Sequence, residues 1–130
     1  MLILTIRTDQ PDAEIGLFQD ANKLAYSTWP AHRQLAETIH LKIKELLDSQ
    51  GRSLDDLEGL VVFRGPGSFT GLRIGLSVAN ALAFSLQIPI MATNNENWLQ
   101  AGISALAQGK NAKLAMPEYG SPPHITLPKK

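Results

Sequence analysis

The sequence predicts an α/β fold in which a mixed five-stranded sheet is covered by helices. Three observations predict it. Short β-branched or aromatic runs fill the first part of the chain, the apolar period then changes to that of a helix, and later helical segments separate two continuous apolar runs. Helices between strands imply crossover connections, so we expect the later strands to be parallel and the first three to be antiparallel.

The first half of the chain is expected to form three strands and one helix. The strands lie in "MLILTIRT" (1–8), "EIGLFQD" (14–20) and "AYSTW" (25–29), and "DANKL" (20–24) supplies the Asp and Asn of a tight turn. The helix runs from Ala31 to about Gln50 and stops at Gly51, which suits a left-handed helix end. Its apolar arc consists of Leu35, Ala36, Ile39, Ile43, Leu46 and Leu47.

The second half alternates strands with helices. "SLDD" (53–56) resembles a short capped turn, and "LEGLVVF" (57–63) reads as a buried strand because its apolar run is continuous. A second helix follows a glycine loop, "IPIMAT" (88–93) is another buried strand, and "NNENWLQAGISALAQG" (94–109) is a helix with Asn caps. The predicted order is therefore βββαβαβα over residues 1–109. From Lys110 the composition shifts to Pro, Gly and Lys, which predicts an extended tail over 110–130.

Composition excludes several classes of protein. The 130 residues fit one domain with one core, and 12 basic residues balance 12 acidic ones, so a self-sufficient nucleic-acid binder is not expected. The absence of cysteine excludes disulfides and thiol catalysis. His32 and His40 are eight residues apart and His124 lies in the tail, so we expect no metal site and no cofactor. Without a long apolar run, the protein is expected to be cytoplasmic and to have no membrane partner.

The glycine loop matches neither of the common phosphate-binding patterns. A Walker A loop needs a lysine that this stretch lacks, and the dinucleotide pattern has Thr70 where its third glycine would stand. Two interpretations remain: amides at the start of the second helix bind an anion, or the turn only satisfies its own caps through Ser68 or Thr70. The candidate loop residues are Gly65, Pro66, Gly67, Ser68, Phe69, Thr70 and Arg73.

The second helix carries a stripe of small residues, one every four positions: Gly71, Gly75, Ala79 and Ala83. Glycine inside a helix costs about 1 kcal/mol relative to alanine, so close packing must offset the loss. We expect a helix from another chain to dock on this stripe. The alternative is packing against the protein's own sheet or first helix.

The segment "GPGSFTGLRIGLSVANALAFSLQIPI" (65–90) closely resembles the signature of the TsaB family, also called YeaZ. "AHRQLAETI" (31–39), "SLDDLEGLVV" (53–62) and the final "PEYGSPPHITLPKK" (117–130) are also similar to parts of that family. The resemblance implies an actin-like, ribonuclease-H-like (ASKHA) lobe, with residues 1–109 as the first lobe and the second lobe lacking. A single lobe is expected to have no complete nucleotide cleft. Arg7 stands where active relatives carry a carboxylate that helps to hold magnesium.

The resemblance also implies a function. The family is the non-catalytic partner of TsaD in making threonylcarbamoyladenosine in tRNA, within a complex that recruits the ATPase TsaE and contacts tRNA only as a whole. Helices one and two pair with their counterparts on TsaD or on a second copy of the same chain. The expected interface residues are His32, Leu35, Ile39 and Ile43 of the first helix, and Gly71, Leu72, Gly75, Leu76, Ala79 and Ala83 of the second.

Two rival functions fit the sequence less well. A minimal phosphate-binding ATPase or kinase-like lobe would complete its site as a homodimer, but Arg7 and the missing lysine argue against it. A glycoprotease would need a serine, histidine and acid at a suitable spacing, and no such set occurs. We therefore expect no catalytic residues.

Overall fold

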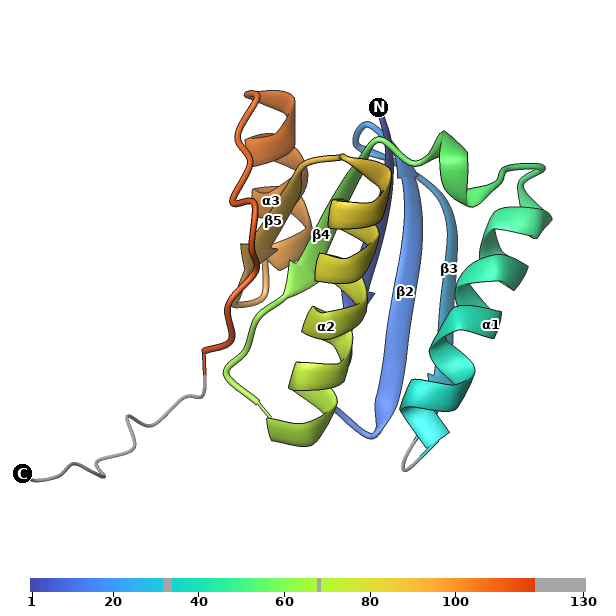
Figure 1. The fold of residues 1–130 in the computed structure, drawn as a ribbon, viewed down its shortest axis with the longest axis vertical. Helices are drawn as coiled ribbons and strands as arrows, with labels where there is room; N and C mark the ends of the chain where they lie inside the picture. The colour runs from blue at the N-terminus through green and yellow to red at the C-terminus, as the bar shows by residue number, and fades with distance from the viewer. Residues whose placement is uncertain (32–33, 68, 119–130) are drawn as a thin grey trace, which may run out of the picture.

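The five strands form one sheet in the order β3-β2-β1-β4-β5 (Figure 1). The protein is described from a computed structural model that covers residues 1–31, 34–67 and 69–118, with only the backbone of Phe69 included. The strands are β1 (Leu2–Arg7), β2 (Asp12–Gln19), β3 (Asn22–Pro30), β4 (Gly59–Phe63) and β5 (Ile90–Thr93). β1 pairs with β2 and β2 with β3 in antiparallel fashion, whereas β1 with β4 and β4 with β5 are parallel. The expected mixed sheet and strand directions are confirmed.

Helices cover both faces of this sheet. α1 (Leu35–Ser49) packs on β2 and β3, and α2 (Phe69–Leu86) packs beside it on β1 and β4 (Figure 1). α3 (Trp98–Ala107) packs on β4 and β5 from the opposite face, and η2 (Leu54–Asp56) is a short 3₁₀ turn before β4. None of the helices in the described part of the chain is long and apolar enough to span a membrane.

Three local features of the structure agree with the sequence prediction. Gly51 has a φ of +64°, and the Arg52 amide donates to the Leu47 carbonyl (2.9 Å), which closes the end of α1. The Ser53 amide donates to Asp56 Oδ2 (2.9 Å), so the capped turn is also confirmed. A continuous apolar run is typical of a strand with both faces covered, and every residue of β4 is buried.

The start of the last helix differs from the prediction. α3 begins at Trp98, and Asn97 makes no side-chain capping bond. Asn94 instead donates from Nδ2 to Glu118 Oε1 (2.6 Å), and Asn95 donates to Asn94 Oδ1 (3.2 Å). The asparagines are used by the turn between β5 and α3 and by the C-terminal segment, so they were wrongly predicted to cap the helix.

Residues 110–118 run without helix or strand along the outer edge of β5 (Figure 1). Near the start of the strand, the Ala112 amide donates to the Ile90 carbonyl (2.8 Å) and the Ile90 amide donates to Asn111 Oδ1 (3.1 Å). At the other end, the Glu118 amide donates to the Arg64 carbonyl (2.7 Å). This part of the predicted tail is therefore fastened to the sheet at both ends.

Thr5 and Thr8 provide a matched test of buried hydroxyls. Thr5 Oγ1 is buried without a hydrogen-bond partner among the described residues, whereas Thr8 Oγ1 donates to the Gly71 carbonyl (2.7 Å). An unsatisfied buried hydroxyl is destabilising, so Thr5→Val should raise the free energy of unfolding by about 1 kcal/mol. Thr8→Val should lower it by a similar amount, as measured by urea denaturation. A loss of stability in Thr5→Val would contradict this assignment.

Candidate partner interface

The small-residue stripe of α2 faces the protein's own sheet. Gly75 is buried, Ala79 has no exposed surface and Ala83 is buried, while Gly71 is half-buried. A Cβ atom on Gly75 would collide with Thr8 Oγ1, which lies directly beneath the helix at the end of β1. The expectation that a foreign helix docks on this stripe is therefore wrong. The alternative, packing on the chain's own sheet, is what the structure shows.

The larger residues expected at the interface are also in the core. Leu72 and Leu76 of α2 are buried against the sheet. The same is true of the expected residues on α1, which are Leu35, Ile39 and Ile43. His32 lies outside the described residues. These side chains hold α1 and α2 in place, because they supply the apolar contact that fixes each helix on the strands below it.

The glycine loop is filled by the protein itself. Gly65 has a φ of +114°, and the Glu118 carbonyl oxygen occupies the space that a Cβ would need. A Cβ on Gly67 would collide with the side chain of Asp9. Ser68 and the side chain of Phe69 lie outside the described residues. Because a carboxylate and a carbonyl oxygen already approach the loop, its surroundings disfavour a phosphate anion.

Arg7 stabilises that carboxylate instead of opening a metal site. Its Nε donates to Asp9 Oδ1 (2.7 Å), and its guanidinium lies 4.0 Å from the centroid of the Phe63 ring. Burial acts to lower the pKa of Arg7, but the hydrogen bond and the charge of Asp9 outweigh it, so the pKa is raised overall. Arg7 is therefore a fixed cation whose charge is balanced within the fold.

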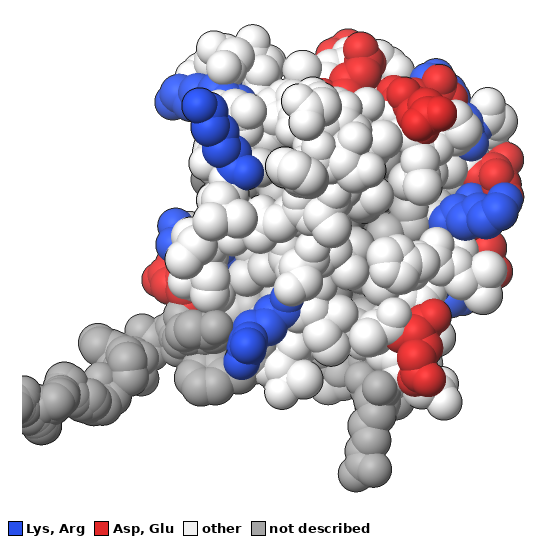
Figure 2. Space-filling model, in the orientation of Figure 1, with Lys and Arg blue, Asp and Glu red and all other residues white. Residues whose placement is uncertain are grey.

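A different face of α2 remains open. Its outward residues follow the helical period and are all exposed: Thr70, Arg73, Ser77, Ala81 and Phe84. Figure 2 shows that the surface over α2 and α1 is largely uncharged, with charged side chains around its margin. Three of these five outward side chains are short, so a second helix could approach this face closely.

α1 completes this open face. A hollow of about 460 Å³ lies between the two helices, lined by Ala36, His40, Thr70, Arg73, Ile74, Ser77 and Val78. A second hollow of about 480 Å³ continues it toward η2, with His40 and Leu82 among its lining residues. We call the surface formed by the half-buried Ile74 and the exposed residues Ala36, His40, Thr70, Arg73, Ser77, Ala81 and Phe84 the outer face. The short residues of the outer face on α2 also recur with the helical period, so the sequence pattern that indicated the buried stripe could have indicated them as well.

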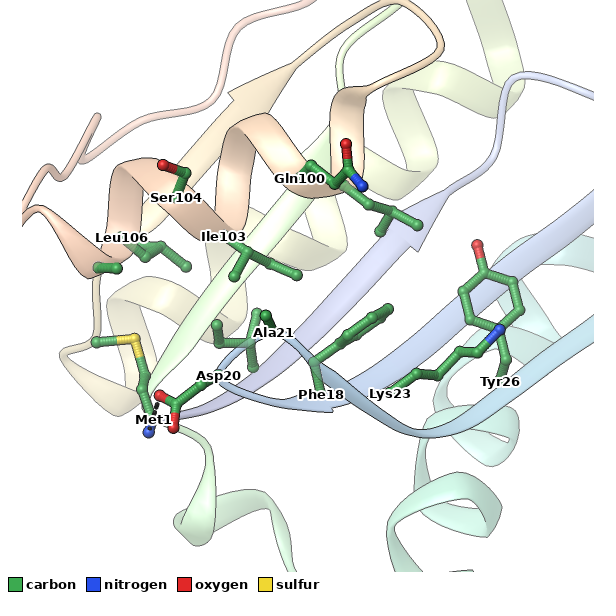
Figure 3. Close-up of a pocket in the computed structure, with 13 residues that line it drawn as sticks. Met1, Phe18, Asp20, Ala21, Lys23, Tyr26, Gln100, Ile103, Ser104 and Leu106 are labelled. Carbon is green, nitrogen blue, oxygen red and sulfur yellow. Dashed lines mark hydrogen bonds and ion pairs between the residues drawn. The ribbon is translucent and has the colours of Figure 1, made fainter.

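A third hollow, of about 780 Å³ and larger than the two beside α1, lies on the opposite side of the sheet. Figure 3 shows Ile103 and Leu106 of α3 facing Phe18 and Ala21 of the β2–β3 hairpin across it. At one end the N-terminal ammonium donates to Asp20 (2.8 Å), which lowers the pKa of that carboxyl. The lining is mainly apolar and offers packing contacts more than reactive groups.

The acidic and histidine side chains of the described residues do not gather into a metal site. Within residues 1–31, 34–67 and 69–118, no group of three or more His, Asp or Glu side chains is placed to hold a metal ion. The hydroxyl of Tyr26 donates to Glu14 Oε1 (2.7 Å) on the neighbouring strand. Burial and this nearby carboxylate raise the pKa of Tyr26 above its ordinary value.

Substituting Gly75 should destabilise the fold whether or not a partner is present. Gly75→Leu places a side chain against buried Thr8 and should lower the free energy of unfolding by at least about 2 kcal/mol. Ser77→Leu, half a turn away on the outer face, should change it by less than about 0.5 kcal/mol. Urea denaturation of both variants tests the orientation of α2, which would be refuted by equal stability.

The raised pKa of Tyr26 predicts a pH dependence. The neutral phenol is favoured in the folded state, so this stabilisation is present below pH about 10, the pKa of an unfolded tyrosine, and decreases as pH rises above it. Between pH 8 and 11, wild type should lose stability more steeply than Tyr26→Phe. Parallel curves for the two proteins would show that Tyr26 does not contribute.

Comparisons with known proteins assign this architecture to a family. The family model "TsaD: tRNA N6-adenosine threonylcarbamoyltransferase" matches residues 29–118. The TsaB protein of Escherichia coli K12, described as a tRNA threonylcarbamoyladenosine biosynthesis protein, is 33% identical over 99 residues, which is 72% of this chain and 40% of that protein. The tRNA N6-adenosine threonylcarbamoyltransferase of Geotalea uraniireducens is 42% identical over 65 residues, which is 50% of this chain and 19% of that enzyme.

A solved structure agrees with these sequence matches. YeaZ from Pseudomonas aeruginosa superposes with a TM-score of 0.66 at 30% identity, covering 83% of this chain and 50% of that chain. The chain thus spans half or less of the length of each of these three relatives. The expected actin-like lobe is confirmed, and the chain belongs to the TsaB (YeaZ) family.

Proposed function

We propose that this protein is a cytoplasmic, non-catalytic subunit in the formation of N6-threonylcarbamoyladenosine in tRNA. It binds a TsaD-like subunit through the outer face and so stabilises the conformation in which that subunit transfers the threonylcarbamoyl group. The observation that carries the proposal is the open, largely uncharged outer face on a member of the TsaB family (Figure 2). A TsaE-like ATPase joins the larger complex, and tRNA is contacted only by the assembly.

The nature of the relatives supports a pairing of similar lobes. The threonylcarbamoyltransferase family model matches residues 29–118, which contain α1 and α2, and a TsaB protein matches 72% of the chain. A partner built on the same lobe can present its own α1 and α2 to this outer face. The two helix pairs then pack as four helices related by an approximate two-fold axis.

The side chains of the outer face suit such packing. Ser77 and Ala81 are short and exposed, so a facing helix can approach the backbone of α2 with little side-chain entropy lost. Ile74 is half-buried beside them and supplies apolar surface. Arg73 is exposed at the margin, where a carboxylate on the partner could pair with it. This combination favours a specific protein contact.

The contacts of the polar side chains near the glycine loop support the proposal that the catalytic residues lie on the partner. Arg7 and Asp9 neutralise one another, and Thr8 is bonded to α2. A phosphate-binding ATPase lobe would need these groups, or the glycine loop, to be available to a ligand. The arrangement therefore favours a binding subunit over that rival.

The outer face can be tested with one bulky substitution. Ser77→Trp should weaken binding to the TsaD subunit of the same organism by at least about 100-fold, because the indole prevents close helix approach. The matched control is Gln100→Trp, an exposed position on α3, which should change the dissociation constant by less than about 2-fold. Isothermal titration calorimetry measures both.

Two results would count against the proposal. The wild-type chain could show no binding to that TsaD subunit at micromolar concentration. Alternatively, Gln100→Trp could abolish binding while Ser77→Trp leaves it intact, which would place the contact on the opposite side of the sheet.

A further inference from the structure

Residues 110–118, which we call the strap, lie beside α2 as well as beside β5 (Figure 1). Asn80 of α2 holds the middle of the strap with both ends of its amide. Nδ2 donates to the Ala115 carbonyl (3.0 Å), and Oδ1 accepts from the Ala115 amide (2.8 Å). This reciprocal pair fixes the position of the strap along the flank of α2.

The same contact turns two apolar side chains outward. Ala115 is only 3% exposed, and its neighbours Leu114 and Met116 are 59% and 56% exposed. Phe84, one helical turn beyond Asn80 on the same side of α2, is 80% exposed. Three of the five large exposed apolar side chains in the described residues therefore come from the junction of the strap and α2.

These three residues continue the outer face. Phe84 belongs to the outward stripe of α2, and the strap lies on the side of α2 away from α1. Two exposed cations, Lys110 and Lys113, lie on the strap itself. An apolar cluster with a basic border complements a surface that carries apolar residues flanked by carboxylates.

We propose that Leu114 and Met116, together with Phe84 of the outer face, form an apolar extension of that face that binds the same TsaD-like subunit. The extension rests on the proposed function. Its occupant is a helical surface of that subunit with apolar side chains and acidic residues at its edge. The strap is then part of the subunit contact, and its bonds to Asn80 hold it in the binding position before the partner is bound.

Two variants test the extension in the full chain. Phe84→Ser should weaken binding to the TsaD subunit by about 10-fold or more, and the double variant Leu114→Ser/Met116→Ser should weaken it by about 10-fold. Gln100→Ser, at an exposed position of α3 on the opposite side of the sheet, is the matched control and should change binding by less than about 2-fold. Thermal unfolding should be unchanged in all of them, since the side chains are exposed.

The outcomes separate this inference from the proposed function. If Ser77→Trp abolishes binding but the Leu114→Ser/Met116→Ser variant binds as wild type, the extension is refuted and the outer face stands. If the wild-type chain binds no TsaD subunit, both fall. Sedimentation velocity of the chain alone gives the remaining outcome: if Phe84→Ser dissociates a homodimer without weakening TsaD binding, a second copy occupies the patch and the inference is overturned.

Discussion

The close approach of α2 to the end of β1 is the constraint on which the rest of the structure depends. Gly75 leaves room for Thr8, and the Thr8 hydroxyl in turn bonds the Gly71 carbonyl one turn earlier (2.7 Å). Because this contact with Thr8 fixes the position of α2, the helix can adopt only one rotation about its own axis. The same orientation places Asn80 against the strap and turns Ser77, Ala81 and Phe84 away from the sheet.

Much of the fold could be predicted from sequence because its signals are local. The continuous apolar run of β4, the glycine that ends α1 and the capped turn before β4 each depend on neighbouring residues. Which face of α2 packs on the sheet could not be predicted in the same way. Small residues at a spacing of four show that something approaches closely, but whether it is Thr8 or a foreign helix is decided by tertiary structure.

The candidate site was harder to predict than the fold for the same reason. The outward residues Thr70, Ser77 and Ala81 are also small, so α2 carries two stripes of small residues. The sequence pattern favoured the stripe with more glycine as the partner interface. Glycine is required where the helix contacts the chain's own strand, because buried packing leaves no alternative position for Thr8. The strap has no periodic pattern, and its pairing with Asn80 joins residues 35 positions apart.

The central claim is that the outer face, and not the hollow beside α3, meets the TsaD-like partner. Hydroxyl-radical footprinting of the chain with and without that subunit measures the exposure of individual side chains. Protection of Phe84 and Met116, with Tyr26 and Met1 as reactive as in the free chain, is the result that this account predicts. Protection of Tyr26 and Met1, with Phe84 and Met116 unchanged, would contradict it.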